Sequence, residues 1–168
     1  PHRIAQSNRR IAEESVDIRY RRQDFAKLLG LSDRALAEAD ARPELASLGA
    51  GPEEYRAEHL SVYRRVLGRR PPRLPIRKQL FLNFKGGTGK TSLSVGYAYR
   101  LAEKGYRVLV LDLDSQGHAT RHLGFQGEDY EHTLHSVLVK RMSINDVLIR
   151  TPLAELHLVP ANLGMTTV

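Results

Sequence analysis

A glycine-rich segment that runs directly into lysine and threonine constrains the fold of this chain more than any other feature. With the serine that follows, its residues are Lys85, Gly86, Gly87, Thr88, Gly89, Lys90, Thr91 and Ser92. Glycines let backbone N–H groups converge on an anion, the second lysine neutralises phosphate charge, and the threonine hydroxyl can bind Mg2+. The segment therefore predicts a phosphate-binding loop (P-loop) whose residues bind a nucleoside triphosphate, most simply ATP with Mg2+.

The order of apolar segments around this loop predicts an α/β domain. Residues 79–84 and 107–113 have the pattern of buried strands, and residues 91–103 between them have the pattern of a helix. A strand, a loop, a helix and a second strand form a βαβ unit, in which the strands are parallel. Further along, the alternation predicts helices at 133–138 and 144–149, the second capped by Ser143, and a strand at 156–159. We expect a P-loop NTPase fold with a parallel sheet.

Two aspartates, Asp112 and Asp114, follow the second predicted strand. Open α/β sheets bind their ligands at the carboxyl ends of the strands, so both side chains are expected near the phosphates. One carboxylate could hold a Mg2+-bound water, and another could orient the water that attacks the γ-phosphate. Thr91, Asp112 and Asp114 are therefore candidates for a metal-binding set. Taken alone, however, the two aspartates are better explained as an ordinary turn that ends a strand, and the assignment depends on the family resemblance given below.

The first part of the chain is predicted to be mainly helical, with a helix-turn-helix pattern. Gly30 ends the first helix of this pattern and Ser32 caps the second. The second helix of such a motif enters the major groove, while residues near the first helix bind the DNA backbone. The DNA-binding residues that we predict are Arg21, Arg22, Ser32 and Arg34. A helical dimerisation or packing module would show the same pattern.

Positive charge is concentrated in this helical part. The net charge of the chain is +7, and residues 1–78 contain 17 lysines and arginines against 11 acidic residues. A basic segment favours phosphate backbones, although a solvated face would show a similar surplus. Three prolines within residues 71–78 predict a linker between the two parts, because they remove backbone donors and disfavour helix.

The loop and the aspartates together resemble the two signatures of the ParA/MinD family of deviant Walker A ATPases. Lys85 stands where that family has its signature lysine, and residues 112–117 match Asp-x-Asp-Pro-Gln-Gly with Ser115 in place of proline. The resemblance implies an ATPase in which Lys85 reaches the phosphates of the other subunit in a nucleotide-sandwich dimer. It also implies that Lys85, Lys90 and Asp114 are catalytic. Asp114 would activate water, and Asp112 would support the Mg2+ shell. Gln116 and residues 117–120 would form a switch that senses the γ-phosphate.

The helical part resembles the winged, MerR-like helix-turn-helix domain of the larger plasmid-partition ParA proteins. The domains that we expect are a subunit-pairing helix at 1–18, the helix-turn-helix domain at 19–70, the linker at 71–78 and the first half of the ATPase domain at 79–168. The chain begins at Pro1 and stops at Val168 without a closing helix. We therefore expect it to be part of a longer protein, and expect hydrolysis by these residues alone to be weak.

The family resemblance implies a function in plasmid or chromosome partition. The ATP-bound dimer would bind DNA, a ParB-type centromere-binding partner would stimulate hydrolysis, and the protein could repress its own operon. No stretch approaches the roughly 18 apolar residues of a membrane span, so we expect a cytoplasmic, nucleoid-associated bacterial protein without a membrane partner. Two alternatives remain open: a ParA-like ATPase that positions another cargo, and a transcriptional repressor that uses nucleotide only as a ligand.

Overall fold

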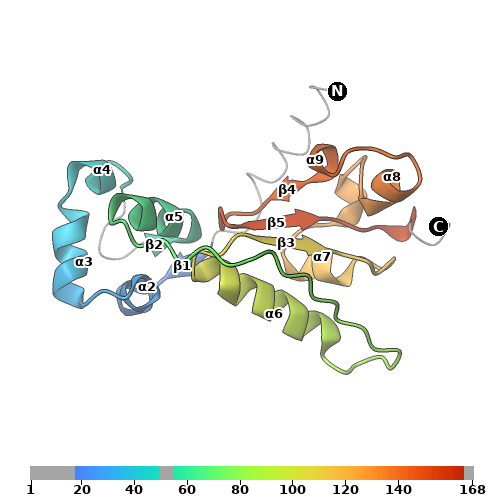
Figure 1. Cartoon of the computed structure of the whole chain (residues 1–168), viewed down its shortest axis with the longest axis horizontal. Helices are drawn as coiled ribbons and strands as arrows, with labels where there is room; N and C mark the ends of the chain where they lie inside the picture. Colours follow the sequence, from blue (N-terminus) through green and yellow to red (C-terminus); the bar gives the residue numbers. More distant parts are fainter. Residues whose placement is uncertain (1–17, 50–54, 165–168) are drawn as a thin grey trace.

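A computed structural model of the chain describes residues 18–49 and 55–164. Figure 1 shows a helical part at the left, formed by residues before 68, and an α/β part at the right, formed by residues from 90 onward. The subunit-pairing helix predicted at 1–18 lies outside the described residues except for its last residue. It therefore stays a prediction.

The helical part contains two adjacent helices joined by a tight turn. Its elements are β1 (Arg19–Tyr20), α2 (Arg22–Leu29), α3 (Asp33–Asp40), α4 (Pro43–Ala46), β2 (Tyr55–Arg56) and α5 (Ala57–Val66). Gly30 ends α2 with a φ of 65°, and Oγ of Ser32 accepts a hydrogen bond from the N–H of Ala35 at 3.2 Å. β1 and β2 pair in antiparallel register. The two helices and their turn lie where the sequence predicts them, while a winged, DNA-binding function for them stays a prediction.

An aromatic cluster forms the centre of the helical part. Phe25 stacks on Tyr55 with ring centroids 4.4 Å apart and meets Tyr63 edge-on at 5.1 Å, and none of the three is exposed. Both tyrosine hydroxyls donate hydrogen bonds to the carboxylate of Asp40, over 2.6 and 2.7 Å. Buried aromatic pairs are stabilising beyond the area they bury, and the hydrogen bonds satisfy the polar ends of the rings. The cluster therefore fixes α2, α3, β2 and α5 together.

The α/β part contains a three-stranded sheet. Its elements are α6 (Lys90–Glu103), β3 (Val108–Leu111), α7 (His118–His122), the 3-10 helix η1 (Gly127–Asp129), α8 (Leu134–Leu138), α9 (Ile144–Val147), β4 (Ile149–Arg150) and β5 (Leu156–Val159). The strand order is β3-β5-β4; β3 and β5 are parallel, with Val108 opposite Leu156, but β4 is antiparallel to β5. The prediction of a parallel sheet is therefore wrong for β4. Only residues 151–155 separate β4 from β5, which is too short for a parallel crossover.

Two element predictions differ from the structure. The helix predicted at 144–149 ends at Val147, and Ile149 is buried in β4 instead. The strand predicted at 79–84 is not formed, and its residues Leu80 and Leu82 are 68% and 69% exposed. A strand is held by backbone hydrogen bonds to a neighbouring strand. Within residues 18–49 and 55–164, none of the paired strands lies against this segment.

The helical part and the α/β part share one hydrophobic core. Ala98 and Ala102 of α6 belong to the same buried cluster as Phe25 and Leu29 of α2, together with Leu156 of β5. Residues 71–78, the predicted linker, form no helix or strand. The helical part is thus packed on the α/β part through α6.

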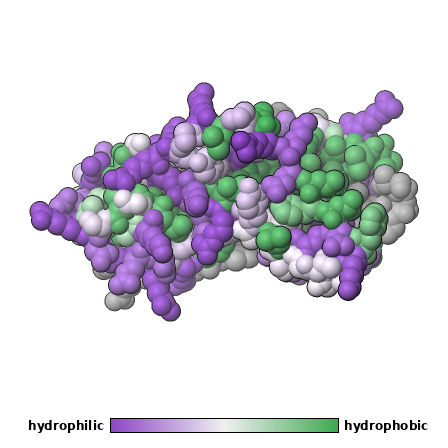
Figure 2. Space-filling model, turned by 60° about the horizontal axis from the view of Figure 1, so that its bottom comes forward, coloured by the Kyte–Doolittle hydropathy of each residue, from purple (hydrophilic) through white to green (hydrophobic). Residues whose placement is uncertain are grey.

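An apolar surface lies on the α/β part, at the right of Figure 2. The exposed leucines of α6, β3 and the segment before the loop are Leu80, Leu82, Leu93, Leu109 and Leu111, each between 44% and 69% exposed. Apolar surfaces of this kind are typical of places where another polypeptide segment packs. In the part of the chain that the structure describes, no helix is long and apolar enough to cross a membrane.

Candidate nucleotide-binding site

The predicted phosphate-binding loop lies directly before α6, and residues 82–89 are exposed. Gly87 and Gly89 have φ values of 71° and 75°, in the left-handed region that favours glycine. Oδ1 of Asn83 accepts a hydrogen bond from the N–H of Lys85 at 3.0 Å, and the hydroxyl of Thr88 donates to the Lys85 carbonyl at 3.3 Å. The loop is therefore a turned, solvent-accessible segment that leads into α6.

The start of α6 provides the second half of the phosphate site. The helix is 14 residues long, and Gly89 is its N-cap. Lys90 and Thr91 in its first turn are partly buried, whereas Ser92 is exposed. The first N–H groups of a helix lack intrahelical acceptors, and the helix dipole is positive at this end, so anions are favoured there. Gly86 in the adjacent loop has open space around it.

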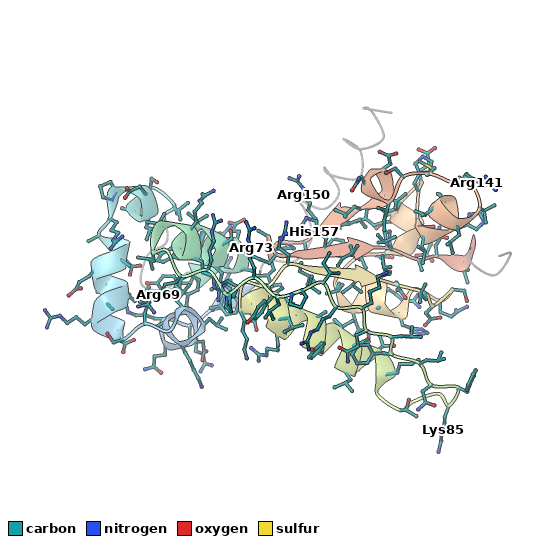
Figure 3. The ribbon with its side chains drawn as sticks, in the orientation of Figure 1. Arg69, Arg73, Lys85, Arg141, Arg150 and His157 are labelled. Carbon is teal, nitrogen blue, oxygen red and sulfur yellow. The ribbon has the colours of Figure 1, made fainter. Side chains whose placement is uncertain are left out.

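Lys85 occupies the tip of the loop. Figure 3 shows its side chain at the far end of the loop, directed away from the rest of the chain. In this position the ammonium group is accessible to a second molecule. The predicted contact with the phosphates of another subunit is compatible with this geometry but stays a prediction.

Asp112 is buried, with 3% of its surface exposed. Its Oδ2 accepts hydrogen bonds from both the N–H and the hydroxyl of Thr120, each at 2.7 Å, and its Oδ1 accepts from the N–H of Asp114 at 3.1 Å. The hydroxyl oxygen of Thr120 in turn accepts from the N–H of Ala161. Asp112 therefore ties the end of β3 to α7 and to the segment after β5. The sequence analysis did not predict this structural role, and the predicted role toward Mg2+ stays a prediction.

Asp114 is the more accessible of the two aspartates. Its Oδ1 accepts a hydrogen bond from the N–H of Gln116 at 3.0 Å, and its Oδ2 lies 2.5 Å from Nδ1 of His118. Burial alone would raise the pKa of Asp114, but the hydrogen bonds from His118 and Gln116 and the charges of His118 and Lys90 outweigh it. The net effect lowers the pKa of this carboxyl below its ordinary value. Asp114 is therefore ionised at neutral pH, within the electrostatic influence of the loop lysine Lys90.

The donor groups at this end of the sheet are oxygens of the kind that Mg2+ binds. Among residues 18–49 and 55–164, no three histidine, aspartate or glutamate side chains form a cluster that could hold a metal ion. Mg2+ needs no such cluster, because one or two protein oxygens, substrate phosphates and waters complete its octahedron. The Thr91 hydroxyl at the phosphate loop and the ionised Asp114 are donors of the required kind.

The predicted DNA-binding residues lie in different environments. Arg21 is exposed just before α2, and the side chain of Arg34 is 91% exposed on α3, with its Nε 3.0 Å from Oε1 of Glu38. Arg22 instead donates hydrogen bonds within the helical part, to Asp40 and to the hydroxyl of Tyr55. Arg21 and Arg34 are therefore accessible, whereas Arg22 holds α2 to α3 and β2.

The α3 surface is less basic than a typical recognition helix. The Ser32 hydroxyl is used as the N-cap, and Asp33 and Glu38 are exposed beside Arg34. A DNA phosphate backbone would meet two carboxylates and one guanidinium on this helix. A role of these residues in DNA binding is not tested by this geometry and stays a prediction.

His118 lies within the predicted switch at 117–120, but its contact with Asp114 was not predicted from the sequence. It is the first residue of α7 and lies four positions after Asp114. Side chains four residues apart can meet where a turn leads into a helix. This spacing was the sequence feature from which the contact could have been suspected. Its contact with Asp114 could not be inferred without the start of α7.

The loop, α6 and the acidic end of β3 define a P-loop NTPase with a mixed α/β sheet. The family model AAA_31, described as an AAA domain, matches residues 77–168, which is more than half of the chain. The chain belongs to this family and, within it, to the ParA/MinD type of ATPase.

The relatives include proteins named for cell division and chromosome partitioning. Cell division protein PomZ of Myxococcus xanthus is 47% identical over 149 residues, which are 89% of this chain and 44% of PomZ. Chromosome partitioning protein ParA of Caulobacter vibrioides is 34% identical over 94 residues, which are 56% of this chain and 35% of that protein. The chain thus spans less than half the length of these relatives.

A solved structure also matches part of the chain. It is cobyrinic acid a,c-diamide synthase from Mycobacterium smegmatis with a bound ATP analog and magnesium, which is 38% identical. The match covers 51% of this chain and 34% of that chain, with a TM-score of 0.45.

Proposed function

We propose that the intact protein is a ParA-like ATPase that binds ATP with Mg2+ at the loop and hydrolyses it to ADP and phosphate. The placement of Lys90 at the start of α6, directly after the exposed glycine loop, is the main support for this proposal. The charge of Lys90 is also among the causes of the lowered pKa of Asp114, as expected if the two groups serve one site. Phosphoryl-transfer enzymes work mainly by positioning and by charge stabilisation, and these two groups provide both.

Each residue of the loop has a specific function in this proposal. The backbone N–H groups of 86–89 and the start of α6 bind the phosphates, and Lys90 neutralises the β- and γ-phosphates. Thr91, Asp112 and Asp114 would bind Mg2+ or its waters, and Ser92 would contact the nucleotide. Bound Mg2+ would neutralise charge on the γ-phosphate. Asp114 would accept a hydrogen bond from the attacking water.

The exposed position of Lys85 supports a nucleotide-sandwich dimer. A lysine directed away from its own chain can reach phosphates bound to a second copy. We propose that ATP joins two subunits through this residue, which makes the dimer a switch controlled by hydrolysis. In the cytoplasm of a bacterium, the dimer would associate with the DNA of the nucleoid, and a ParB-type partner would stimulate hydrolysis.

The helical part is the proposed site of operator binding and autorepression, through Arg21, Arg22, Ser32 and Arg34. The accessibility of Arg21 and Arg34 supports this proposal, while the two carboxylates on α3 weaken it. Positioning of another cargo is the second candidate function, and the 47% identity to a cell division protein favours it. A repressor that uses nucleotide only as a ligand is less well supported, because Asp114 would then have no substrate water to orient.

ATP turnover by the intact protein, with and without DNA, tests the proposed activity. Lys90→Ala should abolish ATP binding and turnover, and Asp114→Ala should abolish turnover while ATP binding persists. Lys104→Ala is the matched control, because Lys104 is an exposed lysine at the other end of α6, and it should behave as the unchanged protein. Turnover that survives Lys90→Ala would show that hydrolysis does not occur at this loop.

DNA binding is tested separately, by comparing random duplex with the DNA upstream of the gene at several salt concentrations. Tighter binding to the upstream DNA that weakens with Arg34→Ala would support operator recognition. Equal, weak affinity for both duplexes would leave a helical packing module.

A further inference from the structure

The carboxylate of Asp114 is held on both oxygens by groups of its own loop. The N–H of Gln116 binds Oδ1 at 3.0 Å, and the ring nitrogen Nδ1 of His118 lies 2.5 Å from Oδ2. The side chains of Asp114 and His118 are 42% and 53% exposed, so the pair lies at the surface of the site. One rotatable carboxylate is thus fixed in a single orientation by two neighbours.

The direction of the hydrogen bond follows from the state of the carboxyl group. An aspartate carboxylate has no hydrogen to donate at neutral pH, so its oxygens only accept hydrogen bonds. Nδ1 of His118 must therefore have the hydrogen and donate it to Oδ2. For this hydrogen bond, the His118 ring needs a hydrogen on Nδ1, which its Nδ1-protonated neutral tautomer has.

The position of His118 is itself fixed by buried contacts. His118 begins α7, and two residues later both the N–H and the hydroxyl of Thr120 bind the buried carboxylate of Asp112. The N–H of Gly117 also donates to the carbonyl of Asp114 at 2.8 Å. These hydrogen bonds hold the start of α7, and with it His118, against the segment after β3 that contains Asp112 and Asp114. A donor fixed in this way can orient a carboxylate without touching the nucleotide.

We propose that His118 is a positioning residue for ATP hydrolysis, which holds Oδ2 of Asp114 through Nδ1–H so that the carboxylate faces the attacking water. The proposal rests on the role of Asp114 proposed above. Misplacing a catalytic group by about 1 Å can cost about 100-fold in rate, so loss of the hydrogen bond should reduce kcat rather than ATP binding.

Steady-state ATP hydrolysis by the intact protein tests this role with His118→Ala, His118→Asn and His122→Ala. His118→Ala should lower kcat about 10- to 100-fold with an unchanged KM for ATP. The amide nitrogen of asparagine stands the same number of bonds from the backbone as Nδ1, so His118→Asn should recover most of kcat. His122→Ala is the matched control, because His122 is an exposed histidine on the same helix, and it should change neither constant.

The outcomes separate this proposal from the proposed activity. Unchanged kcat in His118→Ala, with Asp114→Ala inactive, would overturn the role of His118 alone. A kcat as low in His118→Asn as in His118→Ala, with normal binding of a fluorescent ATP analogue by both, would also overturn it. Normal turnover by Asp114→Ala would instead overturn the role of Asp114 in hydrolysis.

Discussion

The hydroxyl of Tyr20 donates a hydrogen bond to Oε1 of Glu103 over 2.9 Å and joins two parts of the chain that are 83 residues apart in sequence. Glu103 ends α6, the helix that begins at the loop lysine Lys90, and only 2% of its side chain is exposed. Arg64 of α5 donates to the backbone carbonyl of Glu103. One helix therefore has the phosphate site at its first turn and the contact with the helical part at its last.

Tyr20→Phe should destabilise the protein because it removes a hydrogen bond to a buried carboxylate while keeping the ring. Hydrogen bonds to charged groups contribute about 1.5–3 kcal/mol, and we expect the free energy of unfolding to fall by that amount. Tyr97→Phe, the same change at a half-exposed position of α6, should alter it by less than about 0.5 kcal/mol. Urea unfolding followed by circular dichroism measures both. Equal effects of the two changes would mean that the Tyr20 hydroxyl does not hold the parts together.

Gly105→Ala should also weaken the contact between the parts. Gly105 has a φ of 91°, and an added Cβ would lie 2.9 Å from Cδ of Pro71 and 3.0 Å from Cδ of Arg64. The strained backbone costs about 1–2 kcal/mol, and the overpacking adds about 1–3 kcal/mol. Gly68→Ala is the matched control. Gly68 has a φ of 66°, and an added Cβ would have no atom within 4 Å, so this change costs only the backbone strain. The Tm measured by thermal unfolding should therefore be clearly lower for Gly105→Ala than for Gly68→Ala.

The sequence predicted the elements whose signals are local. The glycine loop and α6 depend on adjacent residues, and the caps formed by Ser32 and Ser143 depend on N–H groups within three positions. The segments that form β3 and β5 are short apolar runs, so composition identifies both as strands, although only β5 is mostly buried. The loop and the start of α6 lie together where the sequence predicted them, while the binding roles of their residues stay a prediction.

The features that the sequence did not predict depend on partners that are distant along the chain. The direction of β4 is set by its pairing with β5, and residues 79–84 have the composition of a strand without a neighbouring described strand. Nothing in the local sequence shows that Glu103 meets Tyr20, because a glutamate at the end of a helix is usually solvated. The hydrogen bond of His118 to Asp114 depends on where α7 starts.

Asp40→Ala should be among the most destabilising single changes in the helical part. The carboxylate accepts hydrogen bonds from the buried hydroxyls of Tyr55 and Tyr63 and from Arg22. Truncation leaves all three donors without this acceptor, which we expect to cost about 3–5 kcal/mol. Glu38→Ala removes an exposed acid from the same helix and should cost less than about 1 kcal/mol. Guanidinium unfolding compares the two variants, and similar midpoints would contradict the structural role of Asp40.

Stability should fall when the pH is lowered from 7 to 5, because two histidines are neutral in the folded chain. Burial lowers the pKa of both His59 and His157 below the ordinary 6.5. At His59, the charge of Glu58 partly offsets this shift and the charge of Arg56 adds to it. At His157, the charge of Arg150 lowers the pKa further. Below about pH 6.5 the unfolded chain therefore binds protons that the folded chain does not, and each histidine lowers the free energy of unfolding by at most about 1.4 kcal/mol per pH unit.

Above pH 6.5 both states are neutral at these positions, so their full contribution to stability is present there. Aspartates and glutamates titrate mainly below pH 5, which separates their effect from this window. Replacing both histidines, as in His59→Gln with His157→Gln, should flatten the dependence between pH 7 and 5 measured by urea unfolding. His59 contributes through its buried ring, whose Nδ1 accepts the N–H of Arg56 at 3.1 Å and must give up that hydrogen bond when protonated. An unchanged slope in the double variant would assign the acid sensitivity to other groups.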